Sequence, residues 1–201
     1  MHFTRDKTIR KSLIKQLRNT YNRTHDTVII SEFSLSNTGT RADIAVINGV
    51  LHGYELKGDL DTLARLSGQI DGYNAVFDKV TIVVGKKHLL HTIQAVPDWW
   101  GIVLAKDVTG KGEPLLIELR QPSENIHQDL EAVVSLLWKN EIVEILKQEA
   151  LYKTLTNSVK DELVKVLIAN LSIIDVKDYV RQYLINRNQS SLINWSTTLQ
   201  I

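Results

Sequence analysis

Asp43, Glu55 and Lys57 are the residues of this chain whose types and spacing could do chemistry. They stand in the stretch RADIAVINGVLHGYELKGD, which covers residues 41–59. Two carboxylates held together form a hard oxygen site suited to Mg²⁺ or Mn²⁺, with positions left for water and a phosphate. A neighbouring lysine can position an attacking water and offset charge on the phosphorus centre. These residue types therefore predict hydrolysis of a phosphodiester bond.

The spacing of Glu55 and Lys57 has two interpretations. Residues two apart on a strand leave the same face of a sheet, so the pair is either an exposed salt bridge or part of a catalytic group. Asp43 favours the second interpretation, because a hairpin between Asp43 and Glu55 would return the chain to the same end of the sheet. The sequence predicts such a hairpin, since Asn48-Gly49 separates two apolar runs.

The length of the loop at Asn48-Gly49 decides whether the carboxylates converge. With a two-residue turn, Asp43 would lie opposite Tyr54, and Glu55 would point to the other face of the sheet. The catalytic interpretation requires a loop with an odd number of residues, a bulge, or an Asp43 that bends inward before its strand begins. Bulges are common next to active sites, and we predict one here.

A helix is predicted over residues 61–77, where the apolar residues change to a helical period. Asp59 or Asp61 supplies the acidic start that favours a helix N-terminus. A polar stripe with a spacing of four lies beside the apolar one and consists of Asp61, Arg65, Gln69 and Tyr73. Gln69 and Tyr73 are expected to reach a phosphate or the metal-bound water while their stems pack on the sheet. The alternative is a solvated face with an Asp61–Arg65 ion pair.

The remaining patterns predict a layered α/β protein. An amphipathic helix is expected over residues 6–22. Strands are expected at residues 27–35, 43–47, 50–57 and 80–85 and at a later apolar run, GIVLA. After Pro122, repeated helical stripes replace the strand patterns. We therefore divide the chain into a first domain of residues 1–122 and a helical C-terminal module of residues 123–201.

The order of these motifs resembles the PD-(D/E)XK nuclease superfamily. Asp43, the run Glu55-Leu56-Lys57 and the QIDGY segment that begins at Gln69 carry the resemblance, and the QxxxY helix is similar to that of the RecB-like and virus-type replication–repair branches. The segments RADIAVI, YELKGDLDTLARLSGQIDGY and VPDWWGIVLA resemble a family of small, mostly bacterial proteins in that superfamily. The resemblance covers residues 28–105, although Ala42 stands where many members have proline. It implies a restriction-endonuclease-like αβββαβ core, a mixed sheet flanked by helices, with an all-helical C-terminal extension.

The resemblance also implies roles for individual residues. Asp43 and Glu55 would hold Mg²⁺ or Mn²⁺, and Lys57 would be the catalytic lysine. Gln69 and Tyr73 would complete the catalytic set by supporting the substrate or the site. Glu32 would be a further acidic metal ligand, with an exposed strand residue as the alternative. Arg41 and Arg65 are expected to bind the substrate.

Composition limits the partners and the compartment. The chain has 201 residues, a formal net charge of +1 and no cysteine, which excludes disulfides and thiolate metal sites. No apolar run is long enough to cross a bilayer, so we expect a cytoplasmic protein without a membrane partner. A nucleic acid would have to meet a local basic patch, either on the N-terminal residues 5–23 or at Lys86 and Lys87. A solvated helix face is the alternative for both patches.

The leading hypothesis is a metal-dependent nuclease that acts on nucleic acid, expected to be DNA, in repair, in mobile elements or in defence. One alternative is a catalytically inactive nuclease-fold module that binds nucleic acid or a protein partner. Another is an interaction protein that acts through its C-terminal helices, which could also form a homodimer.

Overall fold

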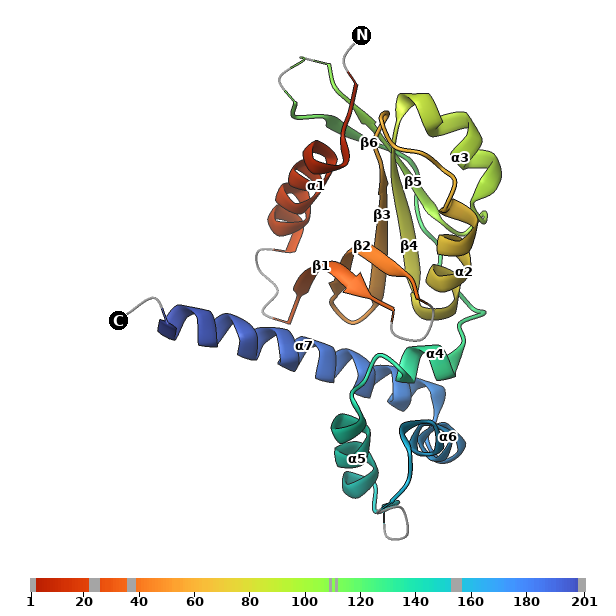
Figure 1. Cartoon of the computed structure of the whole chain (residues 1–201), viewed down its shortest axis with the longest axis vertical. Coiled ribbons are helices and arrows are strands. Elements are labelled where there is room, and N and C mark those ends of the chain that lie inside the picture. The colour runs from red at the N-terminus through yellow and green to blue at the C-terminus, as the bar shows by residue number, and fades with distance from the viewer. Residues whose placement is uncertain are drawn as a thin grey trace.

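The computed structural model describes residues 3–21, 26–35, 39–108, 110, 112–152 and 157–198, with side chains as far as residue 189. Its centre is a six-stranded mixed sheet in the order β1-β2-β3-β4-β5-β6 (Figure 1). The strands are β1 (Val28–Ser34), β2 (Arg41–Ile47), β3 (Leu51–Lys57), β4 (Lys79–Gly85), β5 (Gly101–Lys106) and β6 (Leu115–Arg120). The pairs β3–β4 and β4–β5 are parallel, and the other neighbouring pairs are antiparallel.

Helices flank this sheet and form the C-terminal part of the chain. They are α1 (Asp6–Tyr21), α2 (Leu66–Val76), the 3₁₀ helix η2 (Lys86–His88), α3 (Leu89–Ala95), α4 (Leu130–Val134), α5 (Lys139–Gln148), α6 (Lys160–Asn170) and α7 (Ile173–Thr198). The order α1-β1-β2-β3-α2-β4 is the predicted αβββαβ order. The structure therefore confirms the α/β class, the mixed sheet flanked by helices and the C-terminal helices.

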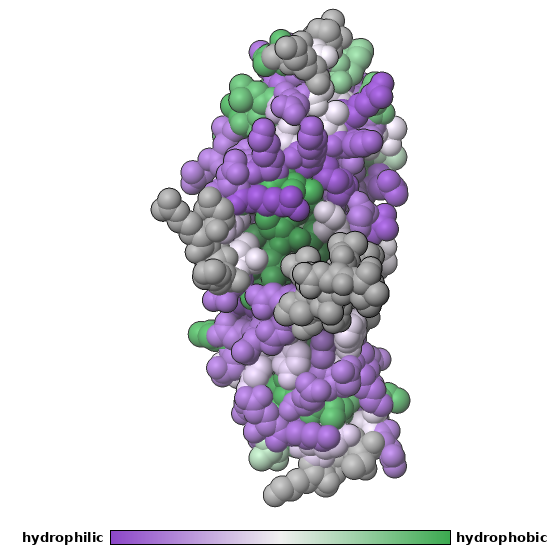
Figure 2. Space-filling view, turned by 90° about the vertical axis from the view of Figure 1, so that its left-hand side faces the viewer, coloured by the Kyte–Doolittle hydropathy of each residue, from purple (hydrophilic) through white to green (hydrophobic). Residues whose placement is uncertain are grey.

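Alternation along β3 delivers its side chains to two different layers. Tyr54 and Leu56 pack with Leu13 of α1 in one apolar cluster. Glu55 and Lys57, on the opposite face, reach side chains of α2. Figure 2 views the side on which α1 lies and shows hydrophobic residues in the middle of this face, framed by hydrophilic ones. The catalytic candidates therefore belong to the α2 layer.

The hairpin between β2 and β3 has a three-residue loop. Ile47 pairs with Leu51 and Ile44 pairs with Tyr54, which leaves Asn48, Gly49 and Val50 as the connection. Gly49 has a φ of 87°, a conformation that favours glycine. The predicted bulge is wrong, because this register has no shift along the pairs that are described. The odd-numbered loop has the same effect, since the continued register sets Asp43 opposite Glu55.

Helix α2 begins five residues later than predicted, at Leu66. Neither acidic residue caps it. Asp61 accepts a hydrogen bond from the Gly58 N–H at 2.6 Å, and Asp59 accepts from Thr4 and Lys87. The prediction that Asp59 or Asp61 starts the helix is therefore wrong, and so is the alternative of a helical Asp61–Arg65 ion pair. Both acidic residues precede the helix and form hydrogen bonds in the β3–α2 loop.

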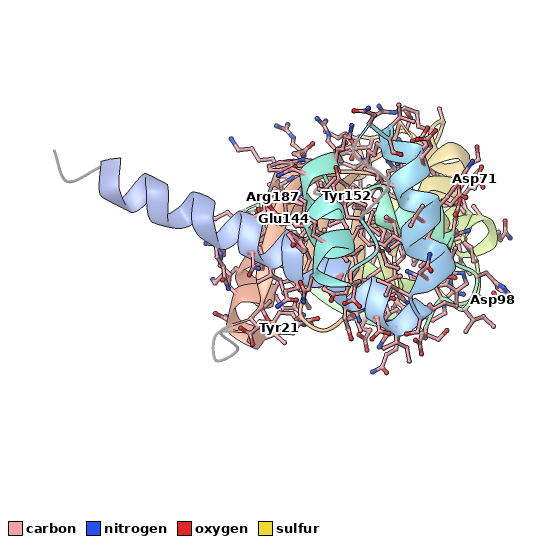
Figure 3. The ribbon with its side chains drawn as sticks, turned by 90° about the horizontal axis from the view of Figure 1, so that it is seen from below. Tyr21, Asp71, Asp98, Glu144, Tyr152 and Arg187 are labelled. Atoms are coloured by element: carbon pink, nitrogen blue, oxygen red, sulfur yellow. The ribbon has the colours of Figure 1, made fainter. Side chains whose placement is uncertain are left out.

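The C-terminal helices share a hydrophobic core with the α2 side of the sheet. Val133, Leu167 and Val180 belong to the same buried cluster as Val76 and Phe77. Seen from below, α7 extends away from the rest of the molecule, and Arg187 lies beside Glu144 where α7 crosses α5 (Figure 3). The division of the chain at residue 122 into two domains stays a prediction. Among the described residues, no helix has the length and apolar character needed to span a membrane.

Candidate active site

Glu55 and Lys57 form a buried ion pair at the end of β3. The Lys57 ammonium lies 2.5 Å from Glu55 Oε1, and the two side chains are 8% and 1% exposed. The Lys57 ammonium also donates to Gln69 Oε1 of α2 at 3.0 Å. The exposed salt bridge considered from the sequence is therefore wrong, because α2 covers the pair. Burying two charges costs free energy unless each is well paired, and here each has more than one partner.

Tyr73 connects Glu55 to the start of β2. Its hydroxyl donates to Glu55 Oε2 at 2.6 Å and accepts from the Asp43 N–H at 3.4 Å. Burial, together with the adjacent Glu55, raises the pKa of Tyr73 well above its usual value, so the phenol remains a neutral donor. The side chain is fully buried. Tyr73 therefore contacts Glu55 in this structure, and its predicted role at a phosphate or at a metal-bound water stays a prediction.

Asp43 stands where β2 separates from β3. The last described backbone pair is Ile44 with Tyr54, and beyond it Asp43 Oδ2 accepts the Leu56 N–H at 2.8 Å. The Asp43 carboxylate thus accepts a β3 backbone N–H beyond the last backbone pair of β2 with β3. Its side chain is 20% exposed, which keeps it open to the cleft described below.

Arg10 of α1 is the residue of this site that the sequence interpretation missed. Its Nη2 lies 2.8 Å from Asp43 Oδ1, and its Nη1 donates to the Asp43 backbone oxygen at 2.7 Å. The same guanidinium contacts Asp6 at 3.1 Å and Glu32 at 3.0 Å. The Asp6–Arg10 spacing of four was visible in the sequence as a helical ion pair, but the contact with Asp43 is tertiary. Of the predicted N-terminal patch, Arg10 faces inward and Arg23 lies outside the described residues.

Glu32 is held by two arginines. It faces Arg10 through Oε1 and Arg41 through Oε2, the latter at 2.7 Å. Its φ is 55°, which is uncommon for a residue other than glycine. Residues with such backbone angles tend to cluster at functional sites. In the described part of the chain, no three His, Cys, Asp or Glu side chains group to hold a metal ion. The role of Glu32 as a further metal ligand stays a prediction.

A cleft of about 780 Å³ opens over the site between α2 and the start of β2. Its lining includes Glu32, Arg41, Asp43, Arg65, Gly68 and Gln69. Both arginines expected to bind substrate are exposed and line this cleft. Of the predicted residues, the cleft thus gathers Glu32, Arg41, Asp43, Arg65 and Gln69. Gln69 connects this lining to the buried Lys57.

The electrostatics of the two carboxylates suit a cation. Burial raises the pKa of Asp43, although the Leu56 N–H and Arg10 oppose the shift. Burial and the charge of Asp43 raise the pKa of Glu55, against the effects of Lys57 and Tyr73. A carboxylate oxygen accepts more than one hydrogen bond or ligand, so the observed contacts leave room for a metal ion. The donor set therefore fits Mg²⁺ or Mn²⁺, which take carboxylate oxygens and retain water.

The fold and the site define an α/β protein with a buried glutamate–lysine pair at the C-terminal end of β3, an interior strand of a mixed sheet. The family model described as Bacteriophage P4 protein cII matches residues 2–200, so the chain belongs to the bacteriophage P4 protein cII family. One relative is Protein cII of Enterobacteria phage P4, which is 28% identical over 162 residues. The match covers 81% of this chain and 60% of the relative, so the chain spans less than two thirds of that protein. No solved structure matches.

Proposed function

We propose that this protein is a divalent-metal-dependent nuclease that hydrolyses phosphodiester bonds in DNA. The observation that carries the proposal is the continuous set of contacts from Gln69 through Lys57 and Glu55 to Tyr73, next to Asp43. In this proposal the sheet and its helices form a restriction-endonuclease-like core of the PD-(D/E)XK type. The relative from a phage favours a mobile-element setting over the other two considered.

Asp43 and Glu55 would hold the metal ion. Mg²⁺ or Mn²⁺, when bound, supplies Lewis-acid stabilisation of charge on the phosphate and on the leaving oxygen. Burial raises the pKa of both carboxylates, and the charge of Asp43 adds to the shift at Glu55. A cation would stabilise both ionised forms at once.

Lys57 would act on the water and the phosphate. Two of its N–H groups have partners, Glu55 and Gln69. The remaining N–H is available to position the attacking water or to bind a phosphate oxygen. Its ammonium charge would offset the negative charge that develops in the transition state.

Gln69 and Tyr73 would be positioning residues. Gln69 Oε1 orients the Lys57 ammonium, and the Tyr73 hydroxyl orients Glu55. Arg41 and Arg65 would contact backbone phosphates at the mouth of the cleft, where their charges are exposed.

The test is cleavage of labelled single-stranded DNA, duplex DNA and RNA in Mg²⁺, Mn²⁺ or chelator. Wild type should cleave DNA only with metal. Lys57→Ala and Asp43→Asn, the latter at a partly buried residue, should lose activity, while Lys165→Ala, at an exposed lysine of α6, should retain it. Thermal unfolding verifies that each variant folds. No cleavage by wild type under any condition, or equal cleavage by wild type and Lys57→Ala, would reject the proposal.

A second candidate function is a nuclease-fold module that binds nucleic acid or protein and cleaves nothing. The Arg10–Asp43 contact favours it, because the guanidinium already supplies a cation to one of the two carboxylates. This candidate predicts DNA or protein binding that is unaffected by chelator, and no calorimetric signal for Mn²⁺. Homodimerisation through the C-terminal helices is a further proposal, tested by sedimentation equilibrium.

A further inference from the structure

A second cavity, of about 650 Å³, opens at the same end of the strands as the cleft. The first residues of β2 and the last residues of β3, β4 and β5 lie at this end of the sheet. This follows because β2 is antiparallel to β3, while β3, β4 and β5 are parallel. The lining of the cavity includes Phe3, Asp59, Lys86, Lys87, Lys106 and Val108. It therefore lies beyond the ends of β4 and β5, where open α/β sheets commonly bind ligands.

Hydrogen bonds hold the N-terminal segment in place as one side of this cavity. The N–H and the hydroxyl of Thr4 both donate to Asp59 Oδ2 at 2.8 Å, and the Lys87 N–H donates to Asp59 Oδ1 at 2.9 Å. A Cβ atom at Gly85 would lie 2.5 Å from Asp59 Oδ1 and 2.6 Å from Thr4 Oγ1. Only glycine allows this packing, which places Phe3 beside the end of β4.

Cationic side chains outnumber anionic ones in the lining of this cavity. Asp59 uses both carboxylate oxygens on Thr4 and Lys87, and Asp107 accepts the Gly110 N–H at 2.7 Å. The Lys87 ammonium donates to a backbone oxygen at 3.1 Å. Within the described residues, no ion pair joins the ammonium groups of Lys86, Lys87 or Lys106 to a carboxylate. Three lysines against two carboxylates leave the cavity with a positive charge.

These features suit an anionic ligand with a flat apolar part. Phe3 and Val108 are each 56% exposed and offer an apolar surface, while the lysines offer donors to phosphate oxygens. A nucleotide combines both properties, since aromatic side chains stack on bases and lysines bind the backbone.

We propose that this cavity binds an unpaired nucleotide of the substrate strand, next to the phosphate that is hydrolysed. The inference rests on the proposed function and narrows its substrate to DNA with a single-stranded segment. Asp59 follows Lys57 by two residues, and β5 lies two strands from β3, roughly 10 Å at ordinary strand spacing. A base stacked in the cavity must be unpaired, because a paired base presents only its edge to a groove.

The test measures binding of fluorescent oligo(dT) and of a blunt duplex by anisotropy, in chelator and at several salt concentrations. The variant is Lys86→Ala/Lys106→Ala, and its matched control is Lys139→Ala/Lys165→Ala on the exposed faces of α5 and α6. Each phosphate contact with a single strand contributes about 0.7 to the salt slope, so the variant should lower the slope for oligo(dT) by about 1.4. The duplex slope should change less, and Lys86→Arg/Lys106→Arg should restore the wild-type value.

Phe3→Ala supplies an independent measurement. Loss of one stacked base should weaken oligo(dT) binding about tenfold and leave the salt slope unchanged. Oligo(dT) affinities and slopes that are equal in wild type, Lys86→Ala/Lys106→Ala and Phe3→Ala would overturn the inference, even if metal-dependent cleavage is observed. Lysine-dependent binding without any cleavage would reject the proposed nuclease and retain the nucleotide site.

Discussion

Arg10 Nη2 lies 2.8 Å from Asp43 Oδ1, so a residue of the first helix holds the carboxylate that marks the start of β2. The same guanidinium contacts Glu32, whose backbone is in the left-handed region. One cation therefore stabilises several acidic groups at the mouth of the cleft. A metal ion at Asp43 would act on the same negative charge, which links Arg10 to metal affinity.

Arg10→Ala is expected to lower the free energy of unfolding in chelator by about 2 kcal/mol. Removing one partner of a buried pair costs about 3–5 kcal/mol, and partial exposure of this pair reduces the loss. The variant should gain more thermal stability from Mn²⁺ than wild type does, because the competing cation is absent. Thermal unfolding with and without Mn²⁺ measures both effects, with the exposed Arg18→Ala as the control. An equal gain in both proteins would contradict the link.

Glu55 and Lys57 should behave as one unit in a double-mutant cycle. Lys57→Met leaves a buried carboxylate without its cation and should cost about 3 kcal/mol. Glu55→Gln/Lys57→Met removes both charges, so it should be more stable than Lys57→Met alone. Urea unfolding of wild type, both single variants and the double variant gives the coupling energy. A double variant whose loss equals the sum of the single losses would mean that the pair is not coupled.

The raised pKa of Glu55 predicts that stability falls as pH rises. The folded state holds the Glu55 proton to a higher pH than the unfolded state, whose ordinary value is 4.5. Between the two pKa values the folded state binds more protons, so the free energy of unfolding decreases with increasing pH. The stabilisation is complete below pH 4.5 and is lost as pH rises through the folded pKa. Urea unfolding of wild type and Glu55→Gln as a function of pH should show this slope reduced in the variant.

Tyr73→Phe should move the pH dependence of metal binding upward. The Tyr73 hydroxyl bonds to the ionised Glu55 and lowers its pKa, so its loss should raise that pKa further. Because metal binding requires the ionised carboxylate, Mn²⁺ affinity should appear at higher pH than in wild type. The aromatic ring still packs on Phe77 and Trp100, which preserves the fold. Calorimetric titration with Mn²⁺ across pH checks this, and superimposable profiles would exclude a role for Tyr73 in positioning Glu55.

Asp78→Ala should loosen the C-terminal helix α7 from the sheet. Asp78 is 3% exposed and lies 2.5 Å from the Lys177 ammonium and 3.4 Å from Arg181, both on α7. It also accepts the Leu51 N–H at 2.7 Å. Loss of this buried carboxylate should cost about 3 kcal/mol and raise hydrogen exchange in α7. Unchanged exchange in α7 would show that the shared apolar core alone holds the helix.

The local pattern of the sequence was sufficient for most elements. Alternation and helical period predicted α1 and the strands β1 to β4, because these signals depend on residues that are neighbours in the chain. The residue types and the resemblance to PD-(D/E)XK nucleases, rather than these patterns alone, predicted that Asp43, Glu55, Lys57, Gln69 and Tyr73 belong to one site. Their chemical roles stay predictions until the experiments above are done.

Tertiary structure decided what local signals leave open. Asn48-Gly49 favours a two-residue turn, but in the structure Val50 is also part of the loop. This extra residue places the Glu55 side chain on the same face of the sheet as Asp43. Packing of α2 on β3 made the Glu55–Lys57 pair buried, whereas its spacing alone fits an exposed pair. Arg10 turns toward Asp43 because α1 lies against the sheet, across a separation of 33 residues. Contacts at such separations are set by how the layers pack together, and the spacing of residues along a single element does not record them.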